Sequence, residues 1–228
     1  MGAPSTVSGL ALLVASAAIA GSVTHINFDS FTTGQPPHGF STALTGGGGP
    51  VSWIVEEDAT APRASKVLTQ TSRDTTNSRF PLCVYDAIAA TDVSVSVRFK
   101  PISGTVDQAA GIVWRYQDAK NYYIVRANAL ENNVVLYKVE NGKRSDLKPT
   151  GAWPLAYGKK APVPAGQWST LAVVARGARF EVHLNGEHLF DVEDATFPSA
   201  GKVGLWTKAD SVTSFDDFTI EPLDSNTP

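Results

Sequence analysis

Residues 109–148 read AAGIVWRYQDAKNYYIVRANALENNVVLYKVENGKRSDLK and decide the fold. Short runs that alternate between apolar and polar residues are separated by turn-forming residues, a pattern typical of antiparallel strands. We expect strands at residues 111–117, 122–128 and 134–140, joined by a turn at 118–121 and a loop at 129–133. Asn141-Gly142 then predicts a hairpin turn into a fourth strand, because both residues tolerate positive φ.

The register of these strands determines which side chains face the core. Pairing Gln117 with Tyr122, and Asn128 with Val134, places the residues on two faces, because side chains alternate along a strand. The predicted buried face consists of Ile112, Trp114, Tyr116, Tyr123, Val125, Ala127, Val135, Tyr137 and Val139. The predicted opposite face consists of Val113, Arg115, Gln117, Tyr122, Ile124, Arg126, Asn128, Lys138 and Glu140. A slip of one residue would exchange the two faces of a strand.

The rest of the chain carries many further short strands. They are predicted at residues 22–29, 53–57, 64–70, 92–102, 167–176, 179–184, 187–192, 201–208 and 212–221. Residues 32–41 and 149–166 are rich in proline or glycine and are expected to be loops. No window of 11 residues beyond the N-terminal segment has helical periodicity. The sequence therefore predicts an all-β jelly-roll β-sandwich of two antiparallel sheets.

The N-terminal segment differs in composition from the rest of the chain. Residues 9–20 form an apolar run that ends in Ala18-Ile19-Ala20, a small-x-small cleavage pattern. Residues 1–20 are therefore predicted to be a signal peptide and residues 21–228 the domain, which makes the protein secreted or periplasmic. No Lys or Arg precedes the run, so a tail or an anchor is the alternative; 12 apolar residues are too few for a stable transmembrane span.

Bulk charge and cysteine content exclude several classes of protein. The formal net charge is −3 and no basic stripe is visible, so nucleic acid is not expected as a partner. The single cysteine, Cys83, excludes an internal disulfide, and its apolar surroundings predict a buried structural thiol.

Several motifs together resemble a known superfamily. They are GQWSTLAV at 166–173, FEVHLNG at 180–186, GKVGLW at 201–206 and FDDF at 215–218. These resemble laminin-G-like domains of the concanavalin-A-like lectin/glucanase superfamily. GIVWRYQD at 111–118 with NYY at 121–123 resembles its 3-keto-disaccharide hydrolase branch. The resemblance implies the fold, but not the activity, since the superfamily includes lectins, hydrolases, lyases and non-catalytic modules.

Common catalytic motifs are missing from the sequence. The Glu-x-Asp-x-x-Glu strand of laminarinase-type glycosidases has no match, because Glu56-Glu57-Asp58 lacks the third carboxylate. Nucleophile-elbow and zinc-protease motifs are also absent. Whether the chain is an enzyme stays open; for a glycoside hydrolase of the 3-keto-disaccharide type, Glu131 is the candidate general acid.

Carboxylates on the first and last strands suggest a metal site. Those strands commonly lie side by side in a jelly roll, which would bring Asp29 close to the pair Asp216-Asp217. Asp29 and Asp217 are the predicted ligands of a structural calcium ion, which related domains often carry there. Otherwise they are surface aspartates, and no other cofactor is expected.

The polar face derived above suggests carbohydrate as the partner. The candidate binding residues are Arg115, Tyr122, Arg126, Asn128 and Lys138, with Trp206 on a neighbouring strand. Arginine donates several hydrogen bonds in a fixed geometry that suits vicinal hydroxyls or acidic groups. We therefore expect a lectin-like module that binds a saccharide on its concave sheet. The alternatives are the hydrolase and a structural or adhesion domain. In the latter, the charged residues only form a solvated sheet face, with cross-strand pairs such as Arg126 with Glu131.

Overall fold

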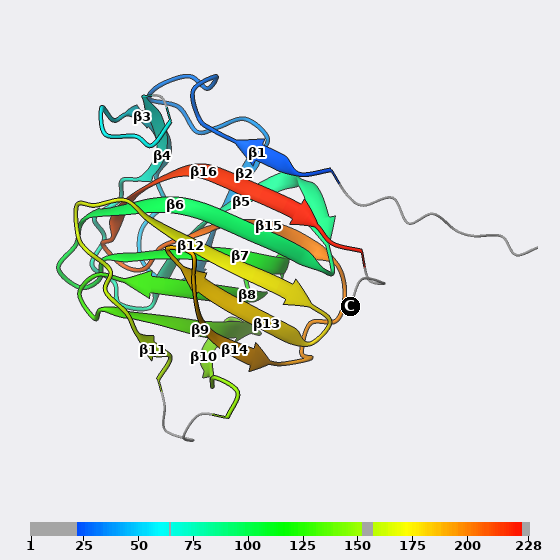
Figure 1. Ribbon diagram of the computed structural model, residues 1–228. Coiled ribbons are helices and arrows are strands. Elements are labelled where there is room, and N and C mark those ends of the chain that lie inside the picture. Colours follow the sequence, from blue (N-terminus) through cyan, green and yellow to red (C-terminus); the bar gives the residue numbers. More distant parts are fainter. Residues whose placement is uncertain (1–21, 64, 152–156, 225–228) are drawn as a thin grey trace, which may run out of the picture.

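Two antiparallel sheets make up the computed structural model, which describes residues 22–63, 65–151 and 157–224 (Figure 1). Sheet A has the order β14 (Glu187–Glu193), β13 (Arg179–Leu184), β12 (Ser169–Arg176), β6 (Val93–Ser103), β16 (Val212–Pro222), β4 (Lys66–Gln70), β3 (Trp53–Glu57), with β1 (Thr24–Ile26) beside β16. Sheet B has the order β10 (Lys143–Leu147), β9 (Asn133–Glu140), β8 (Asn121–Asn128), β7 (Ala109–Asp118), β15 (Gly201–Trp206), β5 (Arg79–Ala90), β2 (Phe40–Gly46), with β11 (Lys159–Lys160) beside β9. The predicted jelly-roll β-sandwich is confirmed.

The main core lies between the two sheets. Val93, Val95 and Val97 of β6 point into it from sheet A, as their alternation with polar residues predicts. From sheet B, Trp114 contacts Phe180 with ring centroids 5.3 Å apart. Cys83 is fully buried in the same core, where burial raises the pKa of its thiol, so it is a structural residue as expected.

Sheet B curls strongly, so that its outer face is concave. Thr45 on the edge strand β2 hydrogen-bonds the Tyr122 hydroxyl of β8 at 2.8 Å, although three strands lie between them in the sheet. The curl buries a second apolar cluster on the outer face: Phe80, Leu82, Val84, Ala109, Val113, Tyr122, Ile124, Val135, Tyr137, Val139 and Trp206. Both faces of sheet B are therefore largely apolar.

A β-bulge in β7 corrects the predicted positions of Arg115 and Tyr116. At the end of β7 next to the turn, Asp118 pairs with Asn121 of β8, as expected. Farther along β7 the register shifts, so that Trp114 pairs with Tyr123. Arg115 takes a φ of 47°, which turns its side chain to the core side of the sheet. Tyr116 instead lies on the concave face, 5.9 Å from the ring of Tyr122. The two residues have exchanged the faces that were predicted for them.

The predicted register of the third strand is wrong by one residue. Asn128 pairs with Asn133 instead of Val134, because Asn132 adopts a φ of 47° and shortens the loop. As a result Val134, Leu136 and Lys138 face the sandwich interior or its rim, and the concave face receives Val135, Tyr137 and Val139. Since the curl buries both faces, the apolar pattern of β9 does not distinguish the two registers.

Other expectations are met or fall outside the described residues. The first and last strands do pair, with Ile26 opposite Phe218. Asn141 and Gly142 form the predicted hairpin turn, with φ of 52° and 79°. Strands β2, β5 and β11 were not predicted; β11 lies within the expected loop 149–166. The proposed signal peptide lies outside the described part of the chain, within which no helix is long and apolar enough to cross a bilayer.

Candidate functional site on the concave sheet

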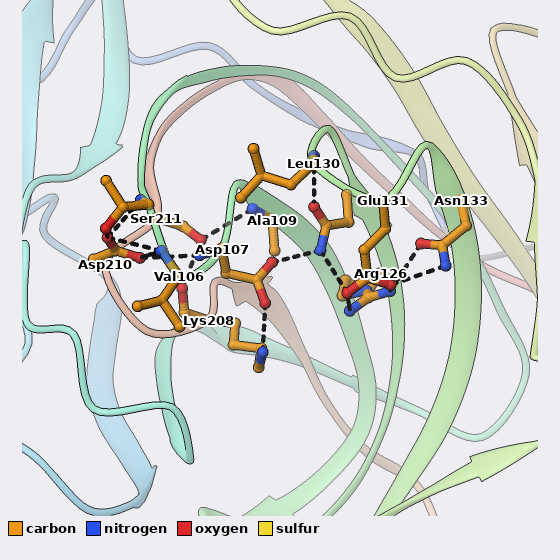
Figure 2. A network of polar contacts seen from close by, with 12 residues as sticks. Val106, Asp107, Ala109, Arg126, Leu130, Glu131, Asn133, Lys208, Asp210 and Ser211 are labelled. Atoms are coloured by element: carbon orange, nitrogen blue, oxygen red, sulfur yellow. Dashed lines mark hydrogen bonds and ion pairs between the residues drawn. The ribbon is translucent and has the colours of Figure 1, made fainter.

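A buried arginine organises the polar end of the concave face. Arg126 is fully buried on β8, and its guanidinium donates to both carboxylate oxygens of Glu131, at 3.2 and 2.8 Å (Figure 2). The same guanidinium donates to the side-chain oxygen of Asn133 at 2.8 Å. Glu131 comes from the β8–β9 loop, so this tight turn folds its carboxylate back over the strand that precedes it.

A second ion pair extends this network across the sheet. Asn128 donates to Asp107 at 2.5 Å and to Glu131 at 3.2 Å, so one amide nitrogen bridges two carboxylates. Asp107 accepts a hydrogen bond from Lys208 at 2.5 Å. Asp210 fixes the loop that carries Asp107 by accepting backbone N–H groups, including that of Asp107 at 3.0 Å (Figure 2). We call Asp107, Arg126, Asn128, Glu131, Asn133 and Lys208 the Arg126 network.

The network keeps Glu131 ionised. Burial would raise the pKa of its carboxyl, but the hydrogen bonds and charge of Arg126, with Asn133 and Lys208, together hold the pKa below its usual range. A general acid must carry a proton at the working pH. The predicted role of Glu131 as a general acid therefore conflicts with its surroundings, whereas an ionised, partly exposed carboxylate can accept hydrogen bonds or a proton.

Aromatic rings continue the site beside the network. The Arg126 guanidinium carbon lies 5.7 Å from the ring centre of Tyr137 and 5.9 Å from that of Tyr157. The two tyrosine hydroxyls are 2.5 Å apart, and Tyr157 is 46% exposed. Trp206 stacks on Phe80 with centroids 5.3 Å apart. We call Phe80, Tyr137 and Trp206 the aromatic floor; all three are buried.

Arg144 covers the aromatic floor from the edge strand β10. Its guanidinium carbon lies 4.6, 4.4 and 5.9 Å from the ring centres of Phe80, Tyr137 and Trp206. These distances are typical of cation–π contacts. Gly111 allows Ile124 and Trp206 to pack directly against the backbone of β7. A Cβ at this position would lie 2.4 Å from the Ile124 side chain and 3.3 Å from the Trp206 ring.

The structure brings together four of the six predicted binding residues. Tyr122, Arg126, Asn128 and Trp206 share the concave face, but all four are buried, so they support the site from beneath. Arg115 lies elsewhere: it donates to the carbonyls of Thr91, Gly177 and Phe197 at the end of the sandwich. Lys138 binds Asp194 and Thr196 at the rim. The shared face predicted for these two residues is wrong, because of the bulge and the one-residue slip.

Sequence reasoning missed four groups of the site. Arg144 and Tyr157, which are at least partly exposed, were not predicted as site residues, and neither were the buried Asp107 and Asn133. A corrected register would have placed Arg144 opposite Val139 and thus on the concave face. Tyr157 gives no such signal, because it reaches the site from a loop. A separate pocket of about 480 Å³, lined by His25, Phe31, His38 and Tyr85 among others, shares no residue with this site.

The two predicted metal ligands have different surroundings. Asp29 accepts hydrogen bonds from the backbone N–H groups of Ser65 and Lys66. Asp217 forms ion pairs with Arg63 and Arg98, at 2.9 and 3.5 Å, so its charge is already balanced.

Asp216, not Asp217, is the buried member of the C-terminal aspartate pair. Asp216 is 1% exposed, and its Oδ2 atom has no hydrogen-bond partner. Burial raises the pKa of Asp216, and the charges of Asp217 and Asp29 raise it further. An orphaned carboxylate oxygen is compatible with calcium. Within the described residues, however, no three His, Cys, Asp or Glu side chains are grouped to hold a metal, so a cation would need backbone carbonyls as well.

Three solved structures share this fold at low sequence identity. The carbohydrate binding module CBM66 from Bacillus subtilis is 22% identical, with a TM-score of 0.59, over 84% of this chain and 99% of that one. Cellulose induced protein Cip1 is 13% identical, with a TM-score of 0.59, over 89% and 97%. Domain 4 of AbnA, a GH43 extracellular arabinanase from Geobacillus stearothermophilus solved with arabinotriose, is 17% identical, with a TM-score of 0.53, over 90% and 94%.

Family membership rests on a sequence match rather than on these structures. No curated protein is similar enough in sequence to count as a relative. A family model does match residues 39–221, which span the chain from the start of β2 to the last strand. The chain belongs to the family of 3-keto-alpha-glucoside-1,2-lyase-like domains.

Proposed function

We propose that this protein is a carbohydrate-binding module that recognises a saccharide on the concave face of sheet B. The observation that carries the proposal is the group of partly exposed polar side chains, Glu131, Arg144 and Tyr157, held in place by buried partners. Hydrogen-bond donors and acceptors that are already fixed beside an exposed ring suit a ligand with many hydroxyls. Little side-chain conformational entropy is then lost when the ligand binds. The names of two similar structures, a carbohydrate binding module and an arabinotriose complex, support this class of ligand.

The proposal can be tested with a glycan array followed by calorimetry. Tyr157→Ala and Glu131→Gln should each weaken binding of the best glycan about 10-fold or more, since each removes a contact at the exposed surface of the site. Glu140→Gln, at the exposed end of β9, is the matched control for Glu131 and should bind like the wild type.

Two outcomes would contradict the concave site. Loss of binding in Tyr85→Ala but not in Tyr157→Ala would move the ligand to the pocket lined by His25 and Tyr85. Absence of binding to every glycan would favour a structural or adhesion domain instead.

A second candidate function is lyase activity on 3-keto-glucosides, which the family description favours. In a 1,2-elimination a general base removes the proton at carbon 2, which the adjacent ketone acidifies. The C1–C2 double bond forms as the bond from carbon 1 to the glycosidic oxygen breaks, and the second sugar leaves as an alcohol after taking up a proton. Glu131 is an ionised and partly exposed carboxylate within the site. If the protein is a lyase, Glu131→Gln should lower the turnover of a 3-keto-glucoside about 100-fold or more, well beyond its effect on binding. Turnover that survives this substitution excludes Glu131 as the base.

We also propose export from the cytoplasm, supported by the apolar run and small-x-small pattern at residues 9–20. N-terminal sequencing of the protein from the producing cells tests this directly. A mature chain that starts at Gly21 is the expected result, and an intact leader in the soluble cytoplasmic fraction contradicts it.

A further inference from the structure

Arg144 differs from five other cationic groups that are buried or nearly so in the described chain. Those groups have carboxylate partners: Arg79 with Asp74, Lys100 with Asp58, Arg115 with Asp92, Arg126 with Glu131, and Lys208 with Asp107. Arg144 is partly buried, yet within the described residues no carboxylate lies within ion-pair distance of it. The segments outside the described residues contain no Asp or Glu that could serve.

The hydrogen-bonding capacity of Arg144 is also unused. Its Nη1 atom is buried without a partner, and in the described part of the chain no hydrogen bond to its guanidinium is present. The side chain is nevertheless held in one place by three rings of the aromatic floor. Buried donors normally find partners, so a positioned and unsatisfied guanidinium indicates that an acceptor is supplied from outside the chain.

The charges around Arg144 leave it without a carboxylate counter-ion. In the Arg126 network the charges of Arg126 and Lys208 are matched by Glu131 and Asp107. Asp146, two residues along the same strand, is paired with Lys148. Glu131 would repel an anionic ligand, but Arg126 contacts both of its oxygens and balances its charge. A positive charge therefore remains on the concave face at Arg144.

From these observations we infer that the module selects acidic saccharides, and that Arg144 binds the carboxylate of a uronic acid residue. This inference rests on the proposed function and names the ligand class for the same site. A planar guanidinium can donate two parallel hydrogen bonds to a carboxylate, an arrangement that lysine cannot reproduce. Tyr157, exposed at the same end of the face, is placed to contact the sugar ring.

The test uses pairs of oligosaccharides that share sequence and linkage and differ only at carbon 6, which carries either a carboxylate or a hydroxymethyl group. The full chain is screened on an array of such pairs, and the strongest pair is measured by calorimetry. The wild type should prefer the carboxylate member about 10- to 100-fold, as expected for a charge-assisted hydrogen bond. The preference should weaken as salt concentration rises if the bound carboxylate stays partly hydrated.

Substitutions assign the preference to one side chain. Arg144→Gln should bind both members of the pair equally, and Arg144→Lys should keep only part of the preference. Lys143→Gln is the matched control, because it removes one positive charge from the adjacent, exposed position of the same strand. This control should retain the wild-type preference. Thermal unfolding followed by circular dichroism checks that each variant is folded.

The outcomes separate this inference from the proposed function. Equal binding of acidic and neutral members by the wild type overturns the inference and leaves carbohydrate binding intact. A preference that survives Arg144→Gln, or is lost in Lys143→Gln, overturns the role of Arg144. Binding of no member of any pair contradicts the proposed function itself.

Discussion

Asp216 is a carboxylate whose surroundings oppose its charge. Its Oδ2 atom is buried without a partner, and Asp29 and Asp217 are close enough to raise its pKa above the ordinary value of 3.8. The folded state therefore holds a proton on Asp216 at pH values where the unfolded chain has lost it. For a carboxyl group with a raised pKa, the contribution to stability is present at low pH and is lost as pH rises through the folded-state pKa.

The substitution Asp216→Asn tests this behaviour together with calcium binding. In a chelating buffer at pH 7 we expect the variant to unfold at a higher temperature than the wild type, since the amide removes an uncompensated buried charge. Adding calcium should raise the melting temperature of the wild type but not that of Asp216→Asn. Asp217→Asn is the control and should be slightly destabilised by losing its pairs with Arg63 and Arg98. A wild-type melting temperature that calcium leaves unchanged would exclude the cation.

At the scale of elements, the bulge in β7 joins the two sheets at one end of the sandwich. Arg115 donates to the carbonyls of Thr91, Phe197 and Gly177, at 2.8, 2.9 and 2.5 Å, which belong to three separate loops. Gly201 makes this possible, because a Cβ there would lie 2.4 Å from the Arg115 carbonyl carbon. One residue with a positive φ thus supplies hydrogen-bond donors to the backbone carbonyls of three loops.

Arg115→Met should destabilise the fold strongly. Three carbonyl oxygens would lose their donor, and each unsatisfied buried group costs about 1–3 kcal/mol, so a total loss of about 3 kcal/mol or more is expected. Equilibrium urea denaturation measures it. Arg98→Met, which removes an arginine side chain that is 46% exposed, should cost less than about 1 kcal/mol. A similar stability for both variants would show that the loop contacts of Arg115 contribute little.

The sequence predicts some elements well and others poorly, for physical reasons. β13 and β3 were predicted to the residue, and β12 and β14 within two residues, because on most of these strands buried residues alternate with more exposed ones. β9 was misregistered because both of its faces are apolar. The bulge at Arg115 has no signal in the residue types. The predicted site therefore kept Arg126 and Asn128 but lost Arg115 and Lys138, and it missed Arg144.

At the scale of the whole molecule, two neighbouring tyrosines tie distant parts together. The Tyr122 hydroxyl meets Thr45 across the concave face, and Tyr123 donates to Asp194 at 2.6 Å at the rim of the sandwich. The pKa of both phenols is raised to about 12, by burial and, for Tyr123, also by its hydrogen bond with Asp194. The folded protein thus keeps two protons that the unfolded chain releases near pH 10.

Stability should therefore fall as pH rises from 10 toward 12. Each phenol should contribute on the order of 2 kcal/mol to this loss, since the folded state binds the proton more tightly than the unfolded state. Tyr122→Phe should show a shallower decline, because it removes one of the tyrosines whose pKa the fold raises. Denaturant midpoints measured at pH 9, 10 and 11 give the slope; equal slopes in both proteins would contradict this assignment.

The position of β16 has a consequence for how the chain is made. This strand, residues 212–222, lies between β6 and β4 and also pairs with β1, so it joins the N-terminal and central parts of sheet A. A ribosome adds about 5–20 residues per second, so β1 and β6 wait on the order of ten seconds for their shared neighbour. The sandwich cannot be completed until residues 212–222 have been made, so the strands made earlier remain without their shared neighbour for most of the synthesis of the domain.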